Sequence, residues 1–386
     1  MRMLIQLGHP AHFHLYKNTA RQLIANGHQV YILIKTKDIL ENLLKEAGLP
    51  YYNILQVAHR KSKWGVILDM LIRDWKILVF SIRHKIDLLT GTSPEVAHIG
   101  WLLQKNAIVT TEDDDAAVPN FGKVIASFVS CVLTPAVCNM GNLESVCSHY
   151  PSYHELAYLH PNHFTPDSKV MEKYGIDFEK PYFVLRFASL NAHHDSGIKG
   201  ITTEVAQRLI DILSPHGRIY ITSERPLEPQ FEQYRIHINP LDMHHVMAFA
   251  SLYIGDSQTM AAEAGVLGVP FVRFNDFVGR IGYLRELEDV YELGYGVHAT
   301  TLDAVSAIRR ADGSEQPSGV EELYSRVEQL VAMPSDERRA TFQSRREKML
   351  SEKIDCAKFL TWFIENYPAS AEGTRKADSK FWDKFR

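Results

Sequence analysis

The densest candidate chemistry in the sequence lies at residues 255–265, Gly-Asp-Ser-Gln-Thr-Met-Ala-Ala-Glu-Ala-Gly, directly after a short apolar run. This pattern predicts a strand that ends in glycine and leads into a helix. Ser257 and Thr259 are residue types that cap helix N-termini, and Gln258 stands between them. The unpaired amides and the positive dipole end at such a helix start bind phosphate. We therefore expect Ser257, Gln258 and Thr259 to hold a diphosphate.

Glu263 lies six residues after Ser257 and so returns to nearly the same helical face, almost two turns later. A carboxylate there can accept hydrogen bonds from the ribose hydroxyls of a nucleotide whose phosphates lie at the helix start. The alternative is an ordinary capped helix whose glutamate is buried with a partner.

A polar loop after the predicted strand 182–187 offers further contacts. The loop carries His193 and His194, and Arg186 lies in the strand itself. Doubly wound sheets bind ligands beyond the carboxyl ends of their strands. We therefore expect the two histidines to close over the phosphates and Arg186 to supply positive charge. The alternative is a solvated loop with two exposed histidines.

Two histidines near the start of the chain could do acid–base chemistry. The sequence reads Gly-His-Pro-Ala-His at residues 8–12, after a predicted strand. A neutral imidazole can accept a proton from an attacking hydroxyl, so we expect His12 to be the general base, with His9 as the next choice. Glu112, which also follows a predicted strand, is a further candidate catalytic carboxylate. The acidic run 112–115 either holds a divalent cation or is an ordinary solvated loop, and we expect no metal there.

The elements that position these residues alternate between short apolar runs and helical periods, which predicts parallel sheets with crossover helices. Three prolines interrupt every periodic pattern at residues 150–167, so we place a domain boundary near Pro166. We therefore expect an α/β fold of two Rossmann-like domains that face a cleft. The first comprises residues 1–165, joined by a C-terminal helix at 355–386, and the second comprises residues 166–354.

The expected strands are residues 2–7, 28–34, 87–90, 107–110, 131–134, 182–187, 218–222, 235–238, 252–255 and 271–274. The expected helices are residues 11–25, 38–47, 94–104, 202–213, 242–250 and 259–267, with mostly helical structure at 319–367. Residues 311–319 read as a polar loop, and residues 368–379 as a mobile segment because they are small, polar and charged.

Composition excludes several classes of protein. The chain has 386 residues, 45% hydrophobic and 23% charged, and a net charge of -4. These values predict about two globular domains and no basic field for nucleic acid. No apolar run is long enough to span a bilayer, and residues 1–8 lack the features of a secretory signal, so we expect a cytoplasmic protein.

Cysteine usage predicts neither disulfides nor a metal site. Four cysteines without a paired motif, Cys131, Cys138, Cys147 and Cys356, read as buried thiols. A zinc site formed by Cys138, Cys147 and His149 would lack the paired ligands of known structural sites.

The stretch 59–85 combines basic side chains with many apolar ones. One interpretation is an amphipathic helix at the inner face of a membrane, suited to a lipid-linked acceptor. The other is a crossover helix whose apolar stripe packs on the sheet.

The segment at 255–270 resembles the nucleotide-sugar site of GT-B enzymes, especially the non-hydrolysing UDP-N-acetylglucosamine 2-epimerases. Ser257, Glu263 and Leu-Gly-Val-Pro at 267–270 match their signature in spacing, while Gln258 and Thr259 replace its glycine pair. The His-Pro-x-His turn and the Gly-Asp-x-x-Thr-Met-x-x-Glu-Ala motif also resemble a bacterial and archaeal family of unknown function related to these enzymes. The resemblance implies the GT-B architecture and a base contact at Ile238.

The first half departs from the epimerases and is similar to the glycosyltransferase MurG. His12 stands fifteen residues before Gly27, which is the MurG spacing, whereas the epimerase Arg-Pro-Glu turn is missing and only Glu112 matches an epimerase carboxylate. The resemblance implies transfer of a sugar from a UDP-linked nucleotide diphosphate sugar to a hydroxyl acceptor, without cofactor or metal. It places the acceptor on the first domain and the nucleotide sugar on the second. A nucleotide-sugar epimerase and an inactive nucleotide-binding protein stay open as alternatives.

Overall fold

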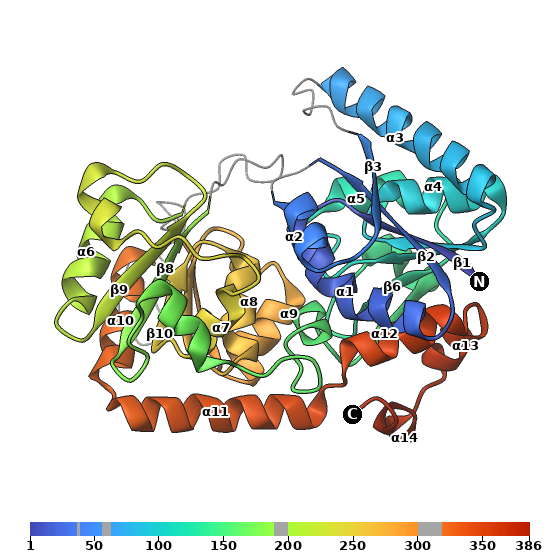
Figure 1. Ribbon diagram of the computed structural model, residues 1–386. Helices are drawn as coiled ribbons and strands as arrows, with labels where there is room; N and C mark the ends of the chain where they lie inside the picture. Colours follow the sequence, from blue (N-terminus) through green and yellow to red (C-terminus); the bar gives the residue numbers. More distant parts are fainter. Residues whose placement is uncertain (37–38, 56–62, 189–199, 300–318) are drawn as a thin grey trace, which may run out of the picture. The chain divides into compact units, whose positions relative to one another are not determined.

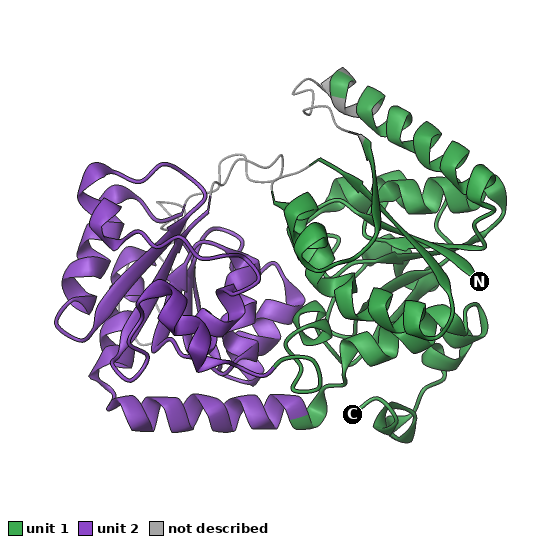
Figure 2. Cartoon of the chain, viewed as in Figure 1, with its two compact units in different colours: residues 1–164, 351–386 green, residues 165–350 purple. Residues whose placement is uncertain are grey.

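The structure, a computed structural model, describes residues 1–36, 39–55, 63–188, 200–299 and 319–386 (Figure 1). The chain forms two compact units (Figure 2). Unit 1 comprises Met1–Phe164 and Ser351–Arg386, and unit 2 comprises Thr165–Leu350. The expected boundary at residues 165–166 lies beside this division, while the chain returns to unit 1 at Ser351, before the expected residue 355.

Unit 1 contains a parallel seven-stranded sheet in the order β3-β2-β1-β4-β5-β6-β7. The reversal of strand order between β1 and β4 is the switch point at which doubly wound sheets bind ligands. Its strands are β1 (Arg2–Leu7), β2 (Gln29–Lys35), β3 (Tyr51–Leu55), β4 (Leu88–Gly91), β5 (Asn106–Thr110), β6 (Val132–Pro135) and β7 (Cys147–Tyr150).

Helices and short helical turns connect these strands. They are α1 (Pro10–Ala25), α2 (Leu40–Glu46), α3 (Lys63–His84), α4 (Pro94–Leu103), α5 (Pro119–Ile125), η1 (Gly141–Val146), η2 (His154–Ala157), α12 (Cys356–Glu365), α13 (Ala369–Arg375) and α14 (Ser379–Asp383). One core joins the sheet to α3 and α4 through buried side chains such as Leu89, Ile77 and Val96. Helix α12 packs beside α1, so the C-terminal segment completes unit 1 (Figure 1).

Unit 2 contains a parallel five-stranded sheet in the order β12-β11-β10-β8-β9. Its strands are β8 (Tyr182–Phe187), β9 (Arg218–Ser223), β10 (Leu252–Gly255), β11 (Phe271–Phe274) and β12 (Gly294–Val297). Its helical elements are η3 (Ser168–Tyr174), α6 (Thr203–Leu213), η4 (Pro229–Tyr234), α7 (Met243–Ala248), α8 (Gln258–Val266), α9 (Gly282–Arg285), η5 (Glu286–Val290), α10 (Gly319–Ala332) and α11 (Ser335–Glu352), the last of which leads back to unit 1. The expectation of two Rossmann-like domains is confirmed.

Two local predictions are wrong. Residues 235–238 form no strand: Arg235 makes one isolated bridge to Ile221, and the Asn239 N–H then donates to the Tyr174 hydroxyl at 3.0 Å, which draws the chain away from the sheet. Residues 368–379 are ordered rather than mobile, because α13 packs on β7 and the Arg375 Nε donates to the Cys147 carbonyl at 3.0 Å. The predicted loop at 311–319 lies almost wholly outside the described residues.

Helix α3 has a buried face, as the crossover interpretation expects, and a second face with exposed apolar side chains, so the membrane interpretation stays a prediction. Ile77 is buried in the core, whereas Leu68, Leu71, Trp75, Val79 and Ile82 are exposed to between 45% and 65%. Among the residues that the structure describes, no helix is both long and apolar enough to cross a bilayer. All four cysteines are buried free thiols, as expected.

Candidate functional site

Helix α8 begins at the carboxyl end of β10, where the sequence predicts a phosphate-binding helix start. Ser257 is its N-cap and accepts a hydrogen bond from the Met260 N–H at 3.5 Å. Gln258 opens the helix, and Thr259 lies in its first turn rather than capping it, because Ser257 already holds the capping position. A Cβ on Gly255 would lie 2.9 Å from the Arg186 carbonyl, so only glycine lets β10 end this close to β8.

Asp256 ties the loops of this edge together. Its buried carboxylate accepts hydrogen bonds from the Ala188 N–H at 2.6 Å and the Ile201 N–H at 3.4 Å. Burial raises the pKa of Asp256 to about 6, against the lowering effect of these bonds and of Arg225. Asp256 therefore fixes the ends of β8 and β10, a role that the Gly-Asp motif alone did not disclose.

Two guanidinium groups lie at the same carboxyl edge. Arg186 on β8 pairs with Glu224, which follows β9. Arg225 donates to the Ile201 carbonyl and lies 5.3 Å from the Phe187 ring. Among the described residues, neither Nε has a hydrogen-bond partner, although both atoms are buried. Unpartnered buried N–H groups are costly, so this edge is suited to an anion.

Glu263 is buried and bonded to a second buried residue. His244 on α7 lies with its Nε2 2.9 Å from Glu263 Oε1, and both residues are 5% exposed. This is the arrangement of the alternative in which the glutamate has a buried partner, so the ribose contact stays a prediction. Sequence reasoning did not single out His244 for this pair, because α7 and α8 meet only in the folded unit.

The remaining residues predicted for this half are less informative. Ile238 is half-buried in the irregular segment after Arg235. His193 and His194 lie outside the described residues.

In unit 1, His9 and His12 follow β1 as predicted, and the ring of each makes hydrogen bonds within the unit. The Ala11 N–H donates to His9 Nδ1 at 3.2 Å, which makes His9 the N-cap of α1. The Gly8 N–H lies 3.1 Å from His12 Nδ1, and the Thr92 hydroxyl lies 2.6 Å from the same atom. The two rings are 5.9 Å apart between centroids.

Thr92 reaches His12 because β4 approaches β1 very closely at Gly91. A Cβ on Gly91 would lie 2.5 Å from the Gln6 carbonyl oxygen, so only glycine fits. Because the Gly8 N–H can only donate, Nδ1 accepts that bond and the neutral ring carries its proton on Nε2. The Thr92 hydroxyl also lies 3.0 Å from Nε2.

Glu112 lies after β5 and contacts a histidine that sequence reasoning missed. Its Oε2 accepts the His154 backbone N–H at 3.3 Å and lies 3.2 Å from His154 Nδ1. Burial lowers the pKa of His154 to about 4, so at neutral pH the uncharged ring donates its Nδ1–H to Glu112. The contact is a hydrogen bond rather than an ion pair, and it orients the carboxylate.

The acidic run after β5 serves at least in part to shape the loop. Asp114 accepts the Asn139 N–H at 2.9 Å, and the Asp115 N–H donates to the Asn139 carbonyl at 2.9 Å. Within the described part of the chain, no residue of this run belongs to a group of converging metal-ligand atoms.

Comparisons with known proteins give similarity in structure only. No family model and no curated protein matches the chain. S. aureus MnaA, solved with UDP, has a TM-score of 0.64 at 11% identity and covers 96% of this chain and 98% of its own. The spinosyn forosaminyltransferase SpnP has a TM-score of 0.60 at 15% identity and covers 95% of this chain and 98% of its own.

A third similar structure is the UDP-GlcNAc 2-epimerase from Neisseria meningitidis bound to UDP-GlcNAc. It has a TM-score of 0.57 at 10% identity and covers 91% of this chain and all of its own. Full-length likeness at such low identity is evidence for fold and not for activity. The chain therefore has the α/β fold with two Rossmann-like units that these GT-B glycosyltransferases and nucleotide-sugar epimerases share.

Proposed function

We propose that this chain is an enzyme that binds a nucleotide diphosphate sugar on unit 2 and transfers the sugar to a hydroxyl acceptor. It would be a GT-B-type glycosyltransferase of cell-surface polysaccharide or glycoconjugate synthesis, with a UDP-sugar as donor. The observation that carries the proposal is the carboxyl edge of unit 2, where the capped start of α8 accompanies two guanidinium groups.

A diphosphate fits the charges of that edge. The start of α8 presents amide N–H groups at Ser257, Gln258 and Thr259, and helix starts attract anions. Arg186, which is paired with Glu224, and Arg225 add two guanidinium groups, and among the described residues the buried Nε–H of each has no partner. Guanidinium groups bind phosphate through paired N–H donors, so this edge would also stabilise the charge on a departing nucleoside diphosphate.

The nucleoside would lie along the next part of α8. Glu263 would accept the ribose hydroxyls, and His244 would hold the carboxylate in one rotamer. Ile238 would contact the base, and His193 and His194 would contact the phosphates. Two structures similar to this chain support a nucleotide ligand: one contains UDP, and the glycosyltransferase SsfS6 has been solved with thymidine diphosphate.

His12 would activate the acceptor. To take the proton of the acceptor hydroxyl at Nε2, the ring would give up the Gly8 N–H bond at Nδ1, carry its proton there, and exchange the contact between Nε2 and Thr92 for the acceptor. The hydroxyl oxygen then bonds to the anomeric carbon, and the bond from that carbon to the diphosphate breaks. The electron pair leaves with the nucleoside diphosphate. His9 and Glu112 would contact the acceptor, and no step requires a metal or another cofactor.

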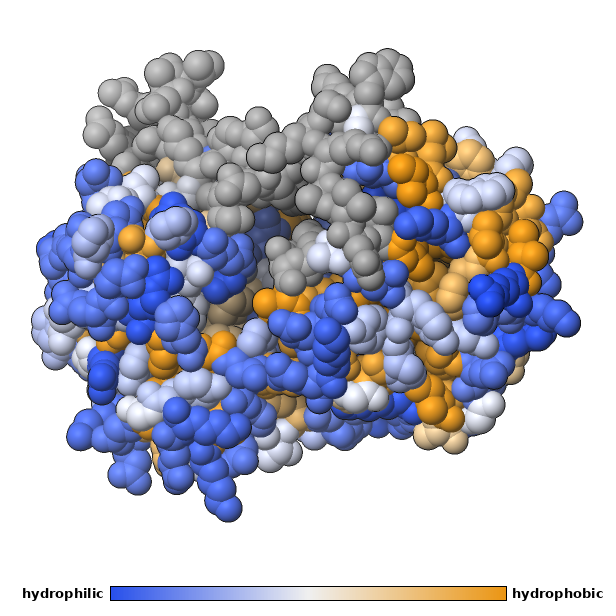
Figure 3. All heavy atoms as spheres, turned by 45° about the horizontal axis from the view of Figure 1, so that its top comes forward, coloured by the Kyte–Doolittle hydropathy of each residue, from blue (hydrophilic) through white to orange (hydrophobic). Residues whose placement is uncertain are grey.

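The exposed stripe of α3 supports a lipid-linked acceptor and a place at the inner face of a membrane. Figure 3 shows hydrophobic side chains at the surface where α3 lies. Lys76 and Arg83 of the same helix are also exposed. Apolar side chains with basic neighbours bind anionic lipid surfaces. The wild-type protein should sediment together with anionic vesicles, and the Trp75→Asp variant should stay in the supernatant. Equal binding to neutral vesicles would argue against an electrostatic contribution to membrane binding.

The four free thiols support a cytoplasmic location.

An epimerase is the second candidate, and the oriented Glu112 carboxylate favours it. Incubation with a panel of nucleotide sugars separates the candidates. Release of nucleoside diphosphate that depends on an acceptor supports transfer, and an altered nucleotide sugar supports epimerisation. Thermal stabilisation without any product would support an inactive nucleotide-binding protein and refute both enzymes.

A further inference from the structure

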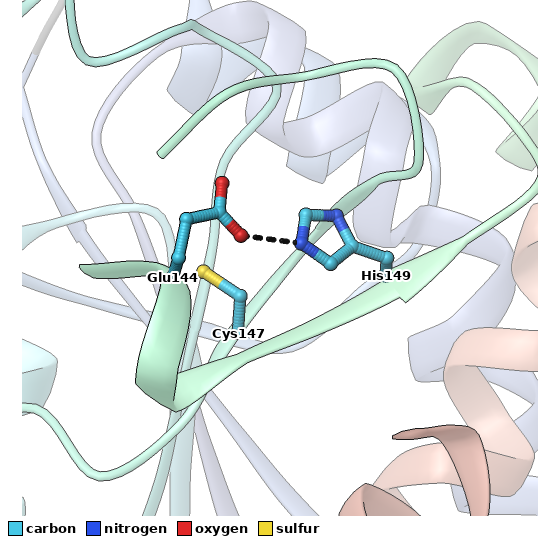
Figure 4. A group of neighbouring side chains, drawn as sticks. All are labelled: Glu144, Cys147 and His149. Atoms are coloured by element: carbon cyan, nitrogen blue, oxygen red, sulfur yellow. Dashed lines mark hydrogen bonds and ion pairs between the residues drawn. The ribbon is translucent and has the colours of Figure 1, made fainter. Parts of the chain in front are cut away.

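Three side chains of different ligand types converge at the end of η1 and on β7 in unit 1 (Figure 4). They are Glu144, Cys147 and His149, whose ligand atoms all lie within 4.8 Å of one another. Cys147 and His149 are two residues apart on one strand, so both side chains project from the same face of β7. The short helix η1 ends beside that strand and brings Glu144 to the same face. This group differs from the cysteine pair considered in the sequence, because Cys138 instead donates to the Glu112 carbonyl.

Each of the three side chains also has a backbone contact that holds it. The Met140 N–H donates to Glu144 Oε1 at 2.8 Å, which leaves Oε2 facing the histidine. The Pro135 carbonyl lies 3.4 Å from His149 Nδ1, and the Cys147 thiol lies 3.2 Å from the Leu143 carbonyl. Metal-bound histidines commonly donate their second ring N–H to a backbone carbonyl in this way.

His149 turns its Nε2 toward Glu144. In the neutral ring with its proton on Nε2, that N–H donates to Glu144 Oε2 at 2.8 Å, while Nδ1 lies 3.4 Å from the Pro135 carbonyl. If a metal ion takes the place of the Nε2 proton, the ring proton lies on Nδ1, where it can donate to the Pro135 carbonyl. Nε2, the carboxylate and the Cys147 thiolate are then the three donors.

We propose that Glu144, Cys147 and His149 bind a zinc-type divalent cation, with water as the fourth ligand. A thiolate, an imidazole and a carboxylate are the donor types that Zn²⁺ takes in proteins, whereas Mg²⁺ and Ca²⁺ prefer oxygen ligands alone. The side chains of Glu144 and His149 are 45% and 34% exposed, so an ion can reach the group from solvent, while Cys147 is buried at its base.

The ion would stabilise the edge of unit 1. Strand β7 is the last strand of the sheet and pairs only with β6 among the described strands. A metal ion bound by both η1 and β7 would hold that edge in place. The site is independent of the proposed sugar transfer, which requires no metal.

Cobalt binding tests the proposal on the full-length chain, freed of metal by a chelator. Co²⁺ should bind at one equivalent and give a thiolate-to-metal charge-transfer absorption, and Zn²⁺ should displace it. Cys147→Ser should abolish that absorption. Glu144→Gln and His149→Ala, which change exposed side chains and preserve the fold, should weaken Co²⁺ binding by at least about 10- to 100-fold, as the loss of even outer contacts does. Cys138→Ser is the matched control, since it removes a buried thiol outside the group and should leave the absorption intact.

The proposal is overturned if the wild-type chain gives no thiolate absorption with one equivalent of Co²⁺. It is also overturned if the absorption persists in Cys147→Ser, or if Glu144→Gln and His149→Ala bind Co²⁺ as tightly as the wild type. Circular dichroism of each variant establishes that it is folded, so that lost binding reports the ligand and not the fold.

Discussion

Replacement of Glu263 separates a binding role from a structural one. In Glu263→Ala, the carboxylate that would hold the ribose is lost, and His244 is left buried without this partner. Hydrogen bonds to a charged group contribute about 1.5 to 3 kcal/mol, so affinity for UDP should fall by roughly 10- to 150-fold. An unsatisfied buried group costs about 1 to 3 kcal/mol, so unit 2 should also unfold more easily by that amount.

Glu263→Gln distinguishes the two effects. The amide has nearly the same shape and can still bond to His244, so unit 2 should stay within about 1 kcal/mol of the wild type. It lacks the charge, so UDP should bind more weakly than to the wild type. Calorimetric titration gives the affinity, and urea unfolding gives the stability. If both variants are folded and bind UDP as the wild type does, Glu263 is a structural partner of His244 and not a nucleotide ligand.

Three further substitutions test the roles of single ionisable groups. His12→Ala should lower turnover by ~100- to 10,000-fold and leave UDP affinity unchanged, and wild-type turnover should fall as acid protonates the imidazole. Turnover that rises in acid would show that His12 acts as a donor. The pKa of Asp256 is about 6 in the folded chain against 3.8 as the ordinary value, so the folded chain binds more protons between these values. The free energy of unfolding should therefore decrease as pH rises from about 4 to about 6, by up to about 3 kcal/mol. Asp256→Asn should remove this dependence in urea unfolding, and an unchanged slope would contradict the burial argument. His154, with a pKa of about 4 against 6.5, gives the opposite sign: stability should decrease as pH falls from about 6.5 to about 4, again by about 3 kcal/mol. His154→Gln should flatten that decrease, and a full decrease in the variant would assign it to other groups.

Local pattern was enough to predict the strand and helix that carry Ser257. A short apolar strand, a capping serine and a helical run are determined by neighbours in sequence, and the structure has them at β10 and α8. The same kind of pattern failed at residues 235–238, where Ile236 and Ile238 alternate with polar residues as in a strand. There the Tyr174 hydroxyl accepts the Asn239 N–H, a contact from another part of the chain that no local pattern contains.

The side-chain pairs of the site could not be predicted because they join separate elements. Glu263 and His244 meet only when α7 packs beside α8, and Glu112 meets His154 only when η2 approaches the end of β5. Arg225 was missed because it lies in a loop after β9 with no motif around it, and its role emerges from its contacts with Ile201 and Phe187. Glu144 joins Cys147 and His149 through η1, a short helix that the sequence did not indicate.

The central claim is that the carboxyl edge of unit 2 binds a nucleotide diphosphate, and calorimetric titration of the wild-type chain with UDP and with uridine tests it most directly. Two guanidinium contacts at about 1.5 to 3 kcal/mol each predict that UDP binds at least about 100-fold more tightly than uridine, and that Arg225→Ala removes much of the difference. Absence of UDP binding, or equal affinity for UDP and uridine, would contradict the account.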